Sequence, residues 1–528
     1  MRGPARPNWF FGMTKAMSQA KGDAYLMFEQ WAQEYGPVFR VPIALGRNQL
    51  VLCDPKAMAH IYSKETYGYV QSGFARIFVE SMIGRGLLWA EGDSHKRQRK
   101  ALTPAFSNSA IRHLTPVFID SAYKVKNAWD ALLEGSGEAI INVQECLDSI
   151  GIAGFSHDFK TLEGQESAIA NVFDDLGRHK PSFFQMLQFL LAGTFPIVWR
   201  IPTAKASLLG QFSSAAGAIS ESLLTKTRSE KVDEGKGDRS VMGLLIKASD
   251  NNSELSVTDE EVLAQMKVLI VAGYETTSIS LTASWTLLEL AKNPALQTKL
   301  REEQVAHFGS NGDPTYDQLN NSLPYLDAVV HETLRLHAPL WHTIRIVGPI
   351  FNLTLPKVLI WRLQSTGDDI IPLSEPVKAA NGEMVDRVAI ATGQEVLVPI
   401  RMINRSCEFW GPDAKAYKPE RWLDENGLPS KAKSLGGHRH LLTFSDGART
   451  CLGKGFALAE FKVRAAGFKS ILCLISAQAI LSVLIRHYAF ELRDGPDTKF
   501  ELGRGLLPRP KVAGEDGCSL PLRVRRIE

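Results

Sequence analysis

The chain lacks the features that mark secreted, membrane-spanning and nucleic-acid-binding proteins. Its 528 residues hold six cysteines, scattered without C-x-x-C spacing, which is typical of a reducing compartment rather than a disulfide framework. Near its start there is no signal-peptide core and no run of about 20 apolar residues. The formal charge of +3 is too small to indicate nucleic acid as a partner. What remains is an ordinary globular composition, 45% hydrophobic and 22% charged, without internal repeats.

Local signals predict a helix-rich chain. Apolar periodicity predicts helices over residues 24–35 and 54–66, and the second is capped by Asp54 with a proline in its first turn. Short strands with turns are predicted over 37–51. Most of the stretch 107–235 has helical periodicity.

One cysteine lies in a glycine-rich loop between Phe444 and Gly455, and an apolar helical pattern follows it. Glycines let the backbone turn tightly and come close to a flat ligand. A helix N-terminus directly after Cys451 stabilises a thiolate, and Arg449 is suited to pairing with a carboxylate. These features together suit a haem with cysteine as its axial ligand, which favours O–O cleavage.

The loop combines Phe444, Gly447, Arg449, Cys451 and Gly453 in the spacing F-x-x-G-x-R-x-C-x-G. A lone cysteine is more often a small buried apolar residue, but five positions within ten residues form a specific pattern. The pattern resembles the haem-binding signature of the cytochrome P450 superfamily, of the eukaryotic microsomal type. The resemblance implies a mainly α fold with a small β region, as a single domain over the whole chain. It also implies haem b (iron protoporphyrin IX) as the cofactor.

A long helix is expected over residues 258–292, and its interior contains Ala272-Gly273-Tyr-Glu275-Thr276. Glycine costs about 1 kcal/mol inside a helix, and threonine there can bond a preceding carbonyl and bend the helix. The motif resembles the superfamily's acid–alcohol pair, A-G-x-E-T. The resemblance implies that Ala272 lies at the haem, that Thr276 hydrogen-bonds oxygen and that Glu275 relays protons. The alternative is a packing kink with a glutamate at the surface.

Glu332 and Arg335 are three residues apart, on one face of a helix predicted for residues 324–337. Such a pair is usually a solvated salt bridge of little weight. The stretches around Trp410 and Arg421, however, resemble the superfamily's meander, whose arginine completes a network with the other two side chains. The resemblance implies that this network holds the scaffold behind the thiolate loop.

A basic stretch over residues 92–100 resembles the superfamily's C-helix. Arg99 matches an arginine that binds a haem propionate, whereas His95 stands where a tryptophan is usual; both histidine and tryptophan can donate a hydrogen bond. Arg345 and His342 also match positions that can reach a propionate. The remaining basic residues are expected to face an electron donor. Without the resemblance, the stretch is a charged and solvated helix face.

Two stretches, 347–364 and 463–478, interrupt the pattern of the superfamily. Each begins with valine, whose codons start with GT, and ends with glutamine, for which one codon is CAG; these are the ends of a short spliceosomal intron. Removing the second stretch restores a continuous amphipathic helix after the cysteine loop. We interpret both stretches as retained introns of a fungal gene, with genuine insertion loops as the alternative.

The expected activity is the insertion of one oxygen atom from O2 into an apolar small molecule, bound by segments 74–88 and 183–199. The resemblance implies electrons from NADPH–cytochrome P450 reductase, with cytochrome b5 as a further donor, and a monomer at the cytoplasmic face of the endoplasmic reticulum membrane. Residues 1–22 resemble the proline-rich hinge that follows a membrane anchor, and the anchor itself is expected to be missing. Two alternatives stay open. One is a haem-thiolate isomerase or lyase, which the acid–alcohol pair disfavours, and the other is a non-functional product of an incompletely spliced message.

Overall fold

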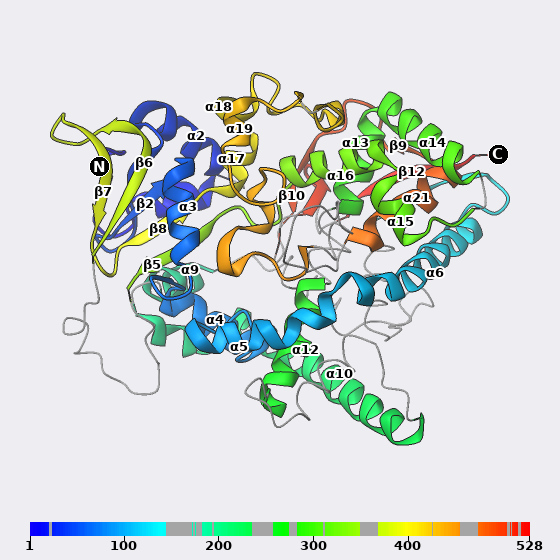
Figure 1. Ribbon diagram of the computed structural model, residues 1–528, viewed down its shortest axis with the longest axis horizontal. Helices are drawn as coiled ribbons and strands as arrows, with labels where there is room; N and C mark the ends of the chain where they lie inside the picture. Colours follow the sequence, from blue (N-terminus) through cyan, green and yellow to red (C-terminus); the bar gives the residue numbers. More distant parts are fainter. Residues whose placement is uncertain are drawn as a thin grey trace.

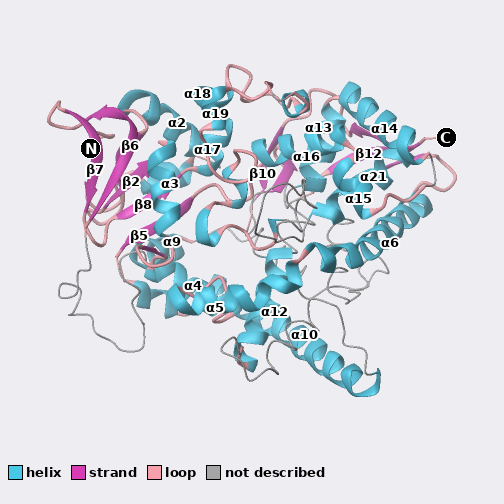
Figure 2. Cartoon of the chain, in the orientation of Figure 1, coloured by secondary structure: helices cyan, strands magenta, loops and turns pink. Residues whose placement is uncertain are grey.

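The structure is a computed structural model in which helices dominate and the strands form small sheets (Figure 2). This agrees with the predicted fold class, mainly α with a small β region. The residues that the structure describes are 1–20, 24–143, 172, 175, 182–192, 195–234, 257–273, 282–309, 312–348, 368–424, 426–454, 474–503, 507, 509–515 and 519–527.

The elements follow one another in the chain as two groups. The first group is α1 (Thr14–Gln19), α2 (Ala24–Tyr35), β1 (Val38–Pro42), β2 (Asn48–Leu52), α3 (Pro55–Lys64), β3 (Tyr69–Val70), α4 (Gly73–Ile83), α5 (Gly92–Leu102), η1 (Thr103–Phe106), α6 (Asn108–Leu132), β4 (Glu138–Asn142), α9 (Phe183–Ala192), η4 (Pro196–Arg200), α10 (Ala204–Glu234) and α12 (Asp259–Gly273). The second group is α13 (Thr282–Lys292), α14 (Pro294–Phe308), α15 (Tyr316–Asn321), α16 (Pro324–Leu336), β5 (Thr343–Val347), β6 (Asp369–Lys378), β7 (Met384–Ile390), β8 (Glu395–Val398), α17 (Ile400–Arg405), α18 (Cys407–Trp410), η6 (Pro419–Trp422), α19 (Ser430–Lys433), η7 (Leu442–Phe444), η8 (Gly447–Arg449), α21 (Leu474–His487), β9 (Tyr488–Leu492), β10 (Phe500–Gly503), β11 (Arg509–Val512) and β12 (Pro521–Arg526).

The largest described sheet joins strands from both groups in the order β1-β2-β8-β5-β3. Strands β2 and β8 run parallel, and the other neighbours are antiparallel. A hairpin of β6 and β7 lies on the same side of the molecule, near the N-terminus, whereas α13, α14 and α21 lie on the opposite side (Figure 1). The sheet therefore sets the position of Arg345, which lies on β5, against the N-terminal elements.

The first residues of the chain are docked on the hairpin of β1 and β2. The Arg6 guanidinium donates to the carbonyls of Ile43, Gly46 and Arg47 at 2.9, 3.0 and 2.8 Å. The segment that resembles a proline-rich hinge is thus held by main-chain acceptors. In the described part of the chain, no helix combines the length and the apolar character that crossing a bilayer requires.

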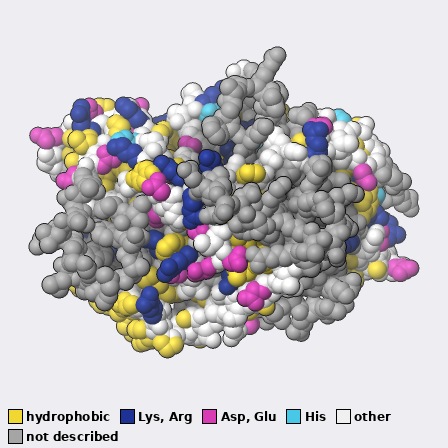
Figure 3. Space-filling view, turned by 60° about the horizontal axis from the view of Figure 1, so that its bottom comes forward, with side chains coloured by type: hydrophobic (Ala, Val, Ile, Leu, Met, Phe, Trp, Pro, Cys, Tyr) yellow, Lys and Arg dark blue, Asp and Glu magenta, His cyan; other side chains and the backbone are white. Residues whose placement is uncertain are grey.

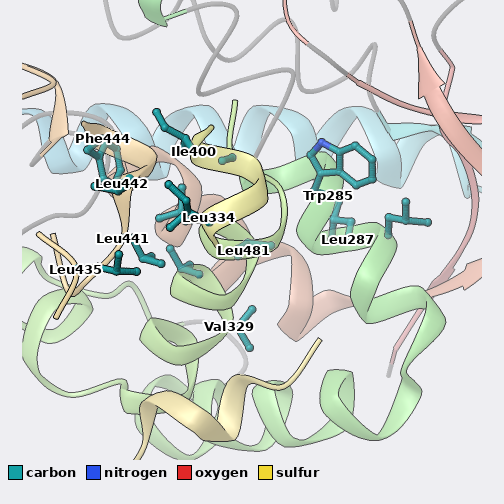
Figure 4. Packing of buried hydrophobic residues seen from close by; sticks show 14 of the residues in the cluster. Trp285, Leu287, Val329, Leu334, Ile400, Leu435, Leu441, Leu442, Phe444 and Leu481 are labelled. Atoms are coloured by element: carbon teal, nitrogen blue, oxygen red, sulfur yellow. The ribbon is translucent and has the colours of Figure 1, made fainter. Parts of the chain in front are cut away.

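The main core surrounds α16, whose residues from Tyr325 to Leu336 are all buried. Apolar side chains of α13, α16, α17, α21 and η7 meet there, as Figure 4 shows for Trp285, Leu334, Ile400, Leu442 and Leu481. Because α16 has no solvent-facing side, its charged residues need partners inside the protein.

Several local predictions are confirmed. Helix α2 has the predicted bounds, and the Asp54 carboxylate accepts the Ala57 N–H at 2.9 Å at the start of α3. The stretch 107–235 is less uniformly helical than its periodicity indicates. It contains the strand β4, which forms because it pairs with β12 near the C-terminus, and local periodicity cannot reveal such a partner.

Candidate functional site

The cysteine loop passes through two short turns, η7 and η8, and closes on itself. The Cys451 N–H donates to the Phe444 carbonyl at 2.9 Å, and the Lys454 N–H donates to the Cys451 carbonyl at 3.1 Å. Between Phe444 and Cys451, the residues Ser445 and Gly447 have positive φ angles of 60° and 67°. The backbone thus fixes the position of the cysteine on both sides.

Gly447 is required by its contact with α3. A Cβ at this position would lie 2.2 Å from the Tyr62 carbonyl oxygen, and the left-handed φ favours glycine as well. The sequence predicts that the glycines of the loop approach a flat ligand, but Gly447 instead approaches the backbone of α3, because the loop packs on that helix. Gly453 does lie beside the thiol: a Cβ there would be 3.8 Å from the Cys451 sulfur.

The Cys451 thiol is exposed and yet deep within the protein. Burial is the main influence on its pKa, which it raises above the ordinary value, although the side chain is accessible. A hydrogen bond from the Gly453 N–H and the positive charges of Arg99 and Lys454 act in the opposite direction. The pKa of the thiol is raised overall, whereas the sequence predicts a stabilised thiolate. The reason is that desolvation outweighs the favourable neighbours. The hydrogen bond and the two positive charges nevertheless favour the thiolate that a metal requires.

Three arginines from different elements converge on the buried His95 of α5. They are Arg99 of α5, Arg345 of β5 and Arg449 of η8. Burial is the largest cause and the three positive charges add to it, so that the pKa of His95 falls to about 3. His95 is therefore neutral at physiological pH, and one of its ring nitrogens carries a donor hydrogen. The fold thus brings together four of the side chains that the sequence assigns to the propionates.

Two glutamates that the sequence reasoning missed pair with these arginines. The Glu65 carboxylate lies 2.9 Å from Arg345 Nε, and Glu91 pairs with Arg449 Nη2. The Arg449 side chain is largely buried, and its Nε has no hydrogen-bond acceptor among the described residues. No local signal distinguishes Glu65 or Glu91 from a surface glutamate, because their partners lie far away in the sequence.

A polar network fastens α5 to α12. Gln265 Nε2 donates to Gln98 Oε1 at 2.7 Å, and Gln98 Nε2 donates to Glu261 Oε1 at 3.0 Å. Arg97 Nη1 donates to Glu261 Oε2 at 3.0 Å. Arg97 was expected to face an electron donor, but it joins the two helices instead. The network fixes the helix that carries His95 against the helix that leads to the acid–alcohol motif.

Helix α12 ends at Gly273, and Ala272 is exposed in its last turn. Glu275 and Thr276 lie outside the described residues, as does the helix predicted directly after the cysteine loop. Helix α13 resumes at Thr282, so both described ends of the predicted long helix are helical. The roles of Glu275 and Thr276 stay predictions.

The structure brings Glu332, Arg335 and Arg421 together in full burial. Arg335 Nε and Nη2 donate to the Glu332 carboxylate at 2.9 and 2.8 Å, and Arg421 Nε donates to it at 3.0 Å. Trp422 Nε1 and the Lys418 N–H add bonds of 3.0 and 2.9 Å. Each charged group in this network is compensated, which is the condition for burying such groups.

The two segments expected to line the substrate pocket pack against each other. Phe74 and Phe78 of α4 meet Phe189 of α9 and Trp199 of η4, with ring centroids 5.0 to 5.8 Å apart and edge-to-face orientations.

His342, which the sequence also predicts to reach a propionate, directly precedes β5. Burial lowers its pKa although the side chain is exposed. Like Cys451, it has an accessible side chain whose pKa is shifted mainly by burial.

Three features of the site suit a haem with a thiolate ligand. The thiol has an N–H donor at its sulfur, three arginines are available for two propionates, and Arg449 Nε is a buried donor with no acceptor in the described chain. Together with the helical fold, they define a haem-thiolate protein.

Comparison with known proteins confirms this class and refines it. The sequence model of the family Cytochrome P450 matches residues 1–348 and 368–467. The cytochrome P450 monooxygenases claP and claQ of Ampulloclitocybe clavipes are each 51% identical, over 100% of this chain and 93% of theirs. Cytochrome P450 monooxygenase 205 of Postia placenta is 32% identical, over 99% of this chain and 92% of its own length. The chain therefore belongs to the cytochrome P450 family and is a monooxygenase with a haem-thiolate cofactor.

Proposed function

We propose that the chain inserts one oxygen atom from O2 into an apolar small molecule, with electrons that come from NADPH. The observation that carries the proposal is the Cys451 thiol, with the Gly453 N–H at its sulfur, close to a cluster of arginines. Bound haem b would supply the activation of oxygen. A flavoprotein reductase delivers the electrons in this proposal, with cytochrome b5 as a further donor, and Glu275 and Thr276 handle the protons. The aromatic side chains of α4, α9 and η4 favour an apolar substrate.

The proposed cofactor contacts follow from the chemistry of the side chains. Cys451 would bind the iron. Arg449, through its unpartnered Nε, would bind a propionate together with Arg345 and Arg99. Neutral His95 would donate one further hydrogen bond, as the tryptophan usual at this position does.

The stretch 347–364 is, in this proposal, not part of the working enzyme. The family match stops at residue 348 and resumes at 368. The residues that remain on either side lie near the turn before β8: Ile346 pairs with Glu395 in the sheet, and the Asp368 carboxylate accepts the Thr392 N–H at 3.2 Å. Because both ends lie beside this turn, the stretch can be removed at the loss of the last residue of β5, without separating the rest of β5 from β6.

The second proposed intron, 463–478, rests on the sequence pattern. The family match ends at residue 467, inside this stretch. Most of the stretch lies outside the described residues, and α21 begins within it at Leu474. Excision of both stretches gives the form of the enzyme that we expect to hold haem most firmly.

The proposed location is the cytoplasmic face of the endoplasmic reticulum membrane. Support comes from exposed apolar side chains of α9, η4 and their flanks, namely Phe183, Phe184, Phe195, Ile197 and Ile201. Phe183 has 71% of its surface exposed and is one of several exposed apolar side chains in this region, and such groups of side chains mark contact sites. Figure 3 shows apolar side chains gathered along the lower left of one face. Flotation of the haem-loaded chain with phosphatidylcholine vesicles tests this contact. The double variant F183S/F184S is expected no longer to float with the vesicles.

The reduced, carbon-monoxide-bound absorption spectrum tests the central proposal. It is recorded for the chain as written and for a variant without residues 347–364 and 463–478. A red-shifted thiolate-type Soret band is expected at least in the shortened variant, and its absence from both would overturn the proposal. Oxygenated product that requires NADPH, O2 and a reductase supports the monooxygenase reaction. Turnover that needs neither NADPH nor O2 would favour the isomerase or lyase instead.

A further inference from the structure

Two buried glutamates lie behind the arginines of the haem site. Glu65 directly follows α3 and is 0% exposed, and Glu91 directly precedes α5 and is 5% exposed. A carboxylate loses its hydration when it is buried, so it must be compensated by a partner or become neutral. The partners therefore indicate what these two residues do.

Each glutamate binds one arginine. Glu65 Oε1 lies 2.9 Å from Arg345 Nε, and Glu91 Oε2 contacts Arg449 Nη2. Glu91 is held in turn by the backbone, because the Gln71 N–H donates to its Oε1 at 3.0 Å. The carbonyl that precedes Glu91 accepts a further bond from Arg449 Nη2 at 3.0 Å. Each arginine is thus paired with a buried glutamate that lies at the end of another element.

The contacts occupy only part of each guanidinium. A guanidinium has five N–H donors in a plane. Arg449 is held through Nη2, while its buried Nε has no acceptor in the described part of the chain. Arg345 Nε forms an ion pair with Glu65 at 2.9 Å, although neither atom makes a hydrogen bond among the described residues, and Arg345 Nη1 donates to the neighbouring Ile344 carbonyl at 3.1 Å. Donors therefore remain on both arginines for a further carboxylate, and the pairs with the glutamates restrict where these donors lie.

The charges of the cluster attract an incoming carboxylate. Arg99, Arg345 and Arg449 are positive, the two glutamates are the acids beside them, and His95 is neutral because its pKa is about 3. Burial raises the pKa of both glutamates, and the arginine charges oppose that rise. Without an added anion the three positive charges outnumber the two negative ones, so the cluster attracts an anionic group such as a propionate.

We propose that Glu65 and Glu91 are positioning residues that hold Arg345 and Arg449 so that the remaining N–H groups of both arginines meet the haem propionates. The inference rests on the proposed function, since it presupposes haem at Cys451. A long arginine side chain loses rotamer freedom when it binds an anion, and a partner that has already ordered it removes this cost from the binding step. Outer partners of metal ligands act in the same way, and their loss typically costs about 10- to 100-fold in affinity.

The test is a double-mutant cycle on the rate of haem loss from the full chain to an excess of apomyoglobin. The variants are E91A, R449A and the two combined, and likewise E65A, R345A and the two combined. Each glutamate variant is expected to lose haem about tenfold faster than wild type. If the glutamate acts through its arginine, each double variant loses haem no faster than the arginine variant alone.

A glutamine series separates positioning from a purely structural role. E65Q and E91Q keep an acceptor for the arginine but remove its charge, so haem loss between that of wild type and that of the alanine variants is expected. They also serve where an alanine variant does not fold. D54N is the matched control, because Asp54 is a buried carboxylate at the other end of α3 and, among the described residues, accepts from backbone and hydroxyl donors of Ala57 and Ser374 rather than from an arginine. It is expected to lower the unfolding midpoint but to leave haem loss within about twofold of wild type.

The outcomes distinguish this inference from the proposed function. Absence of a thiolate-type band from both the chain as written and the variant without residues 347–364 and 463–478 overturns both. A normal band, with haem-loss effects of glutamate and arginine that multiply in the double variants, overturns the positioning role alone. Haem loss from D54N as fast as from E65A would likewise assign the effect to general destabilisation and overturn it.

Discussion

Replacing Glu332 by glutamine perturbs the buried network that supports the thiolate loop. The substitution keeps the shape of the side chain but removes the carboxylate shared by two buried guanidinium groups, those of Arg335 and Arg421, whose exposed surface is 0% and 3%. Removal of one partner from a buried ion pair costs about 3–5 kcal/mol, because it leaves an uncompensated charge in the interior. Arg421 keeps a second, partly exposed partner in Asp413 at 3.3 Å, so the uncompensated charge would be mainly that of Arg335.

This cost is large against the whole stability of a domain, which is about 5–15 kcal/mol. We expect E332Q to lower the free energy of unfolding by about 3–5 kcal/mol. Urea unfolding of the haem-free chain, followed by tryptophan fluorescence, measures the change directly, since Trp410 and Trp422 lie at the network. Haem content after purification should fall with it, because the network lies behind the cysteine loop.

A matched control is the ion pair of Asp317 and Arg112, which is equally short at 2.7 Å but about 60% exposed on both sides. D317N is expected to cost no more than about 1 kcal/mol, because water screens an exposed pair. If E332Q and D317N changed the free energy of unfolding by the same small amount, the reasoning from burial would be wrong. E332D, which keeps the charge, is expected to lie between E332Q and wild type.

Three further perturbations have outcomes that the structure determines. G447A is expected to abolish haem retention, because a Cβ there meets the Tyr62 carbonyl at 2.2 Å in a left-handed backbone conformation; the absorption spectrum of the purified variant measures it. Deletion of 347–364 is expected to keep the circular dichroism of the chain and to raise its thermal midpoint, because the remaining ends, Ile346 and Asp368, both lie beside the turn before β8. Below about pH 6.5 the unfolded chain protonates His95 while the folded chain, with its pKa of about 3, does not, so stability falls as pH falls, by up to about 1.4 kcal/mol per unit. Urea midpoints of the haem-free chain between pH 7 and 5 measure this slope, which H95Q should reduce.

Each of these expectations has a clear contrary result. Full haem occupancy in G447A would show that α3 yields to the new side chain, and G453A is the comparison, because a Cβ there makes an ordinary contact of 3.8 Å. Loss of helical signal on deleting 347–364 would show that this stretch is a genuine part of the fold. An unchanged pH slope in H95Q would mean that His95 is not neutral in the folded chain.

Much of the site could be predicted from the sequence where the chemistry is local. The loop around Cys451, the Asp54 cap and the pairing of Glu332 with Arg335 depend on residues a few positions apart, so spacing alone was sufficient to propose them. The mainly helical class followed for the same reason, since periodicity is a local property. The place of Arg421 beside Glu332 came from family resemblance, because nothing local connects the two.

The arrangement of the arginines depends on how distant elements pack. Glu65 meets Arg345 and Glu91 meets Arg449 only because the fold brings α3 beside β5 and α5 beside η8. The same packing directs Gly447 against α3 rather than towards a ligand. The sequence determined which class of enzyme this is and singled out Cys451 as the proposed iron ligand, because that information is concentrated in one short loop. How the charges around that residue are balanced was decided by tertiary structure, because burial and long-range pairing, not residue type, set their partners and their pKa values.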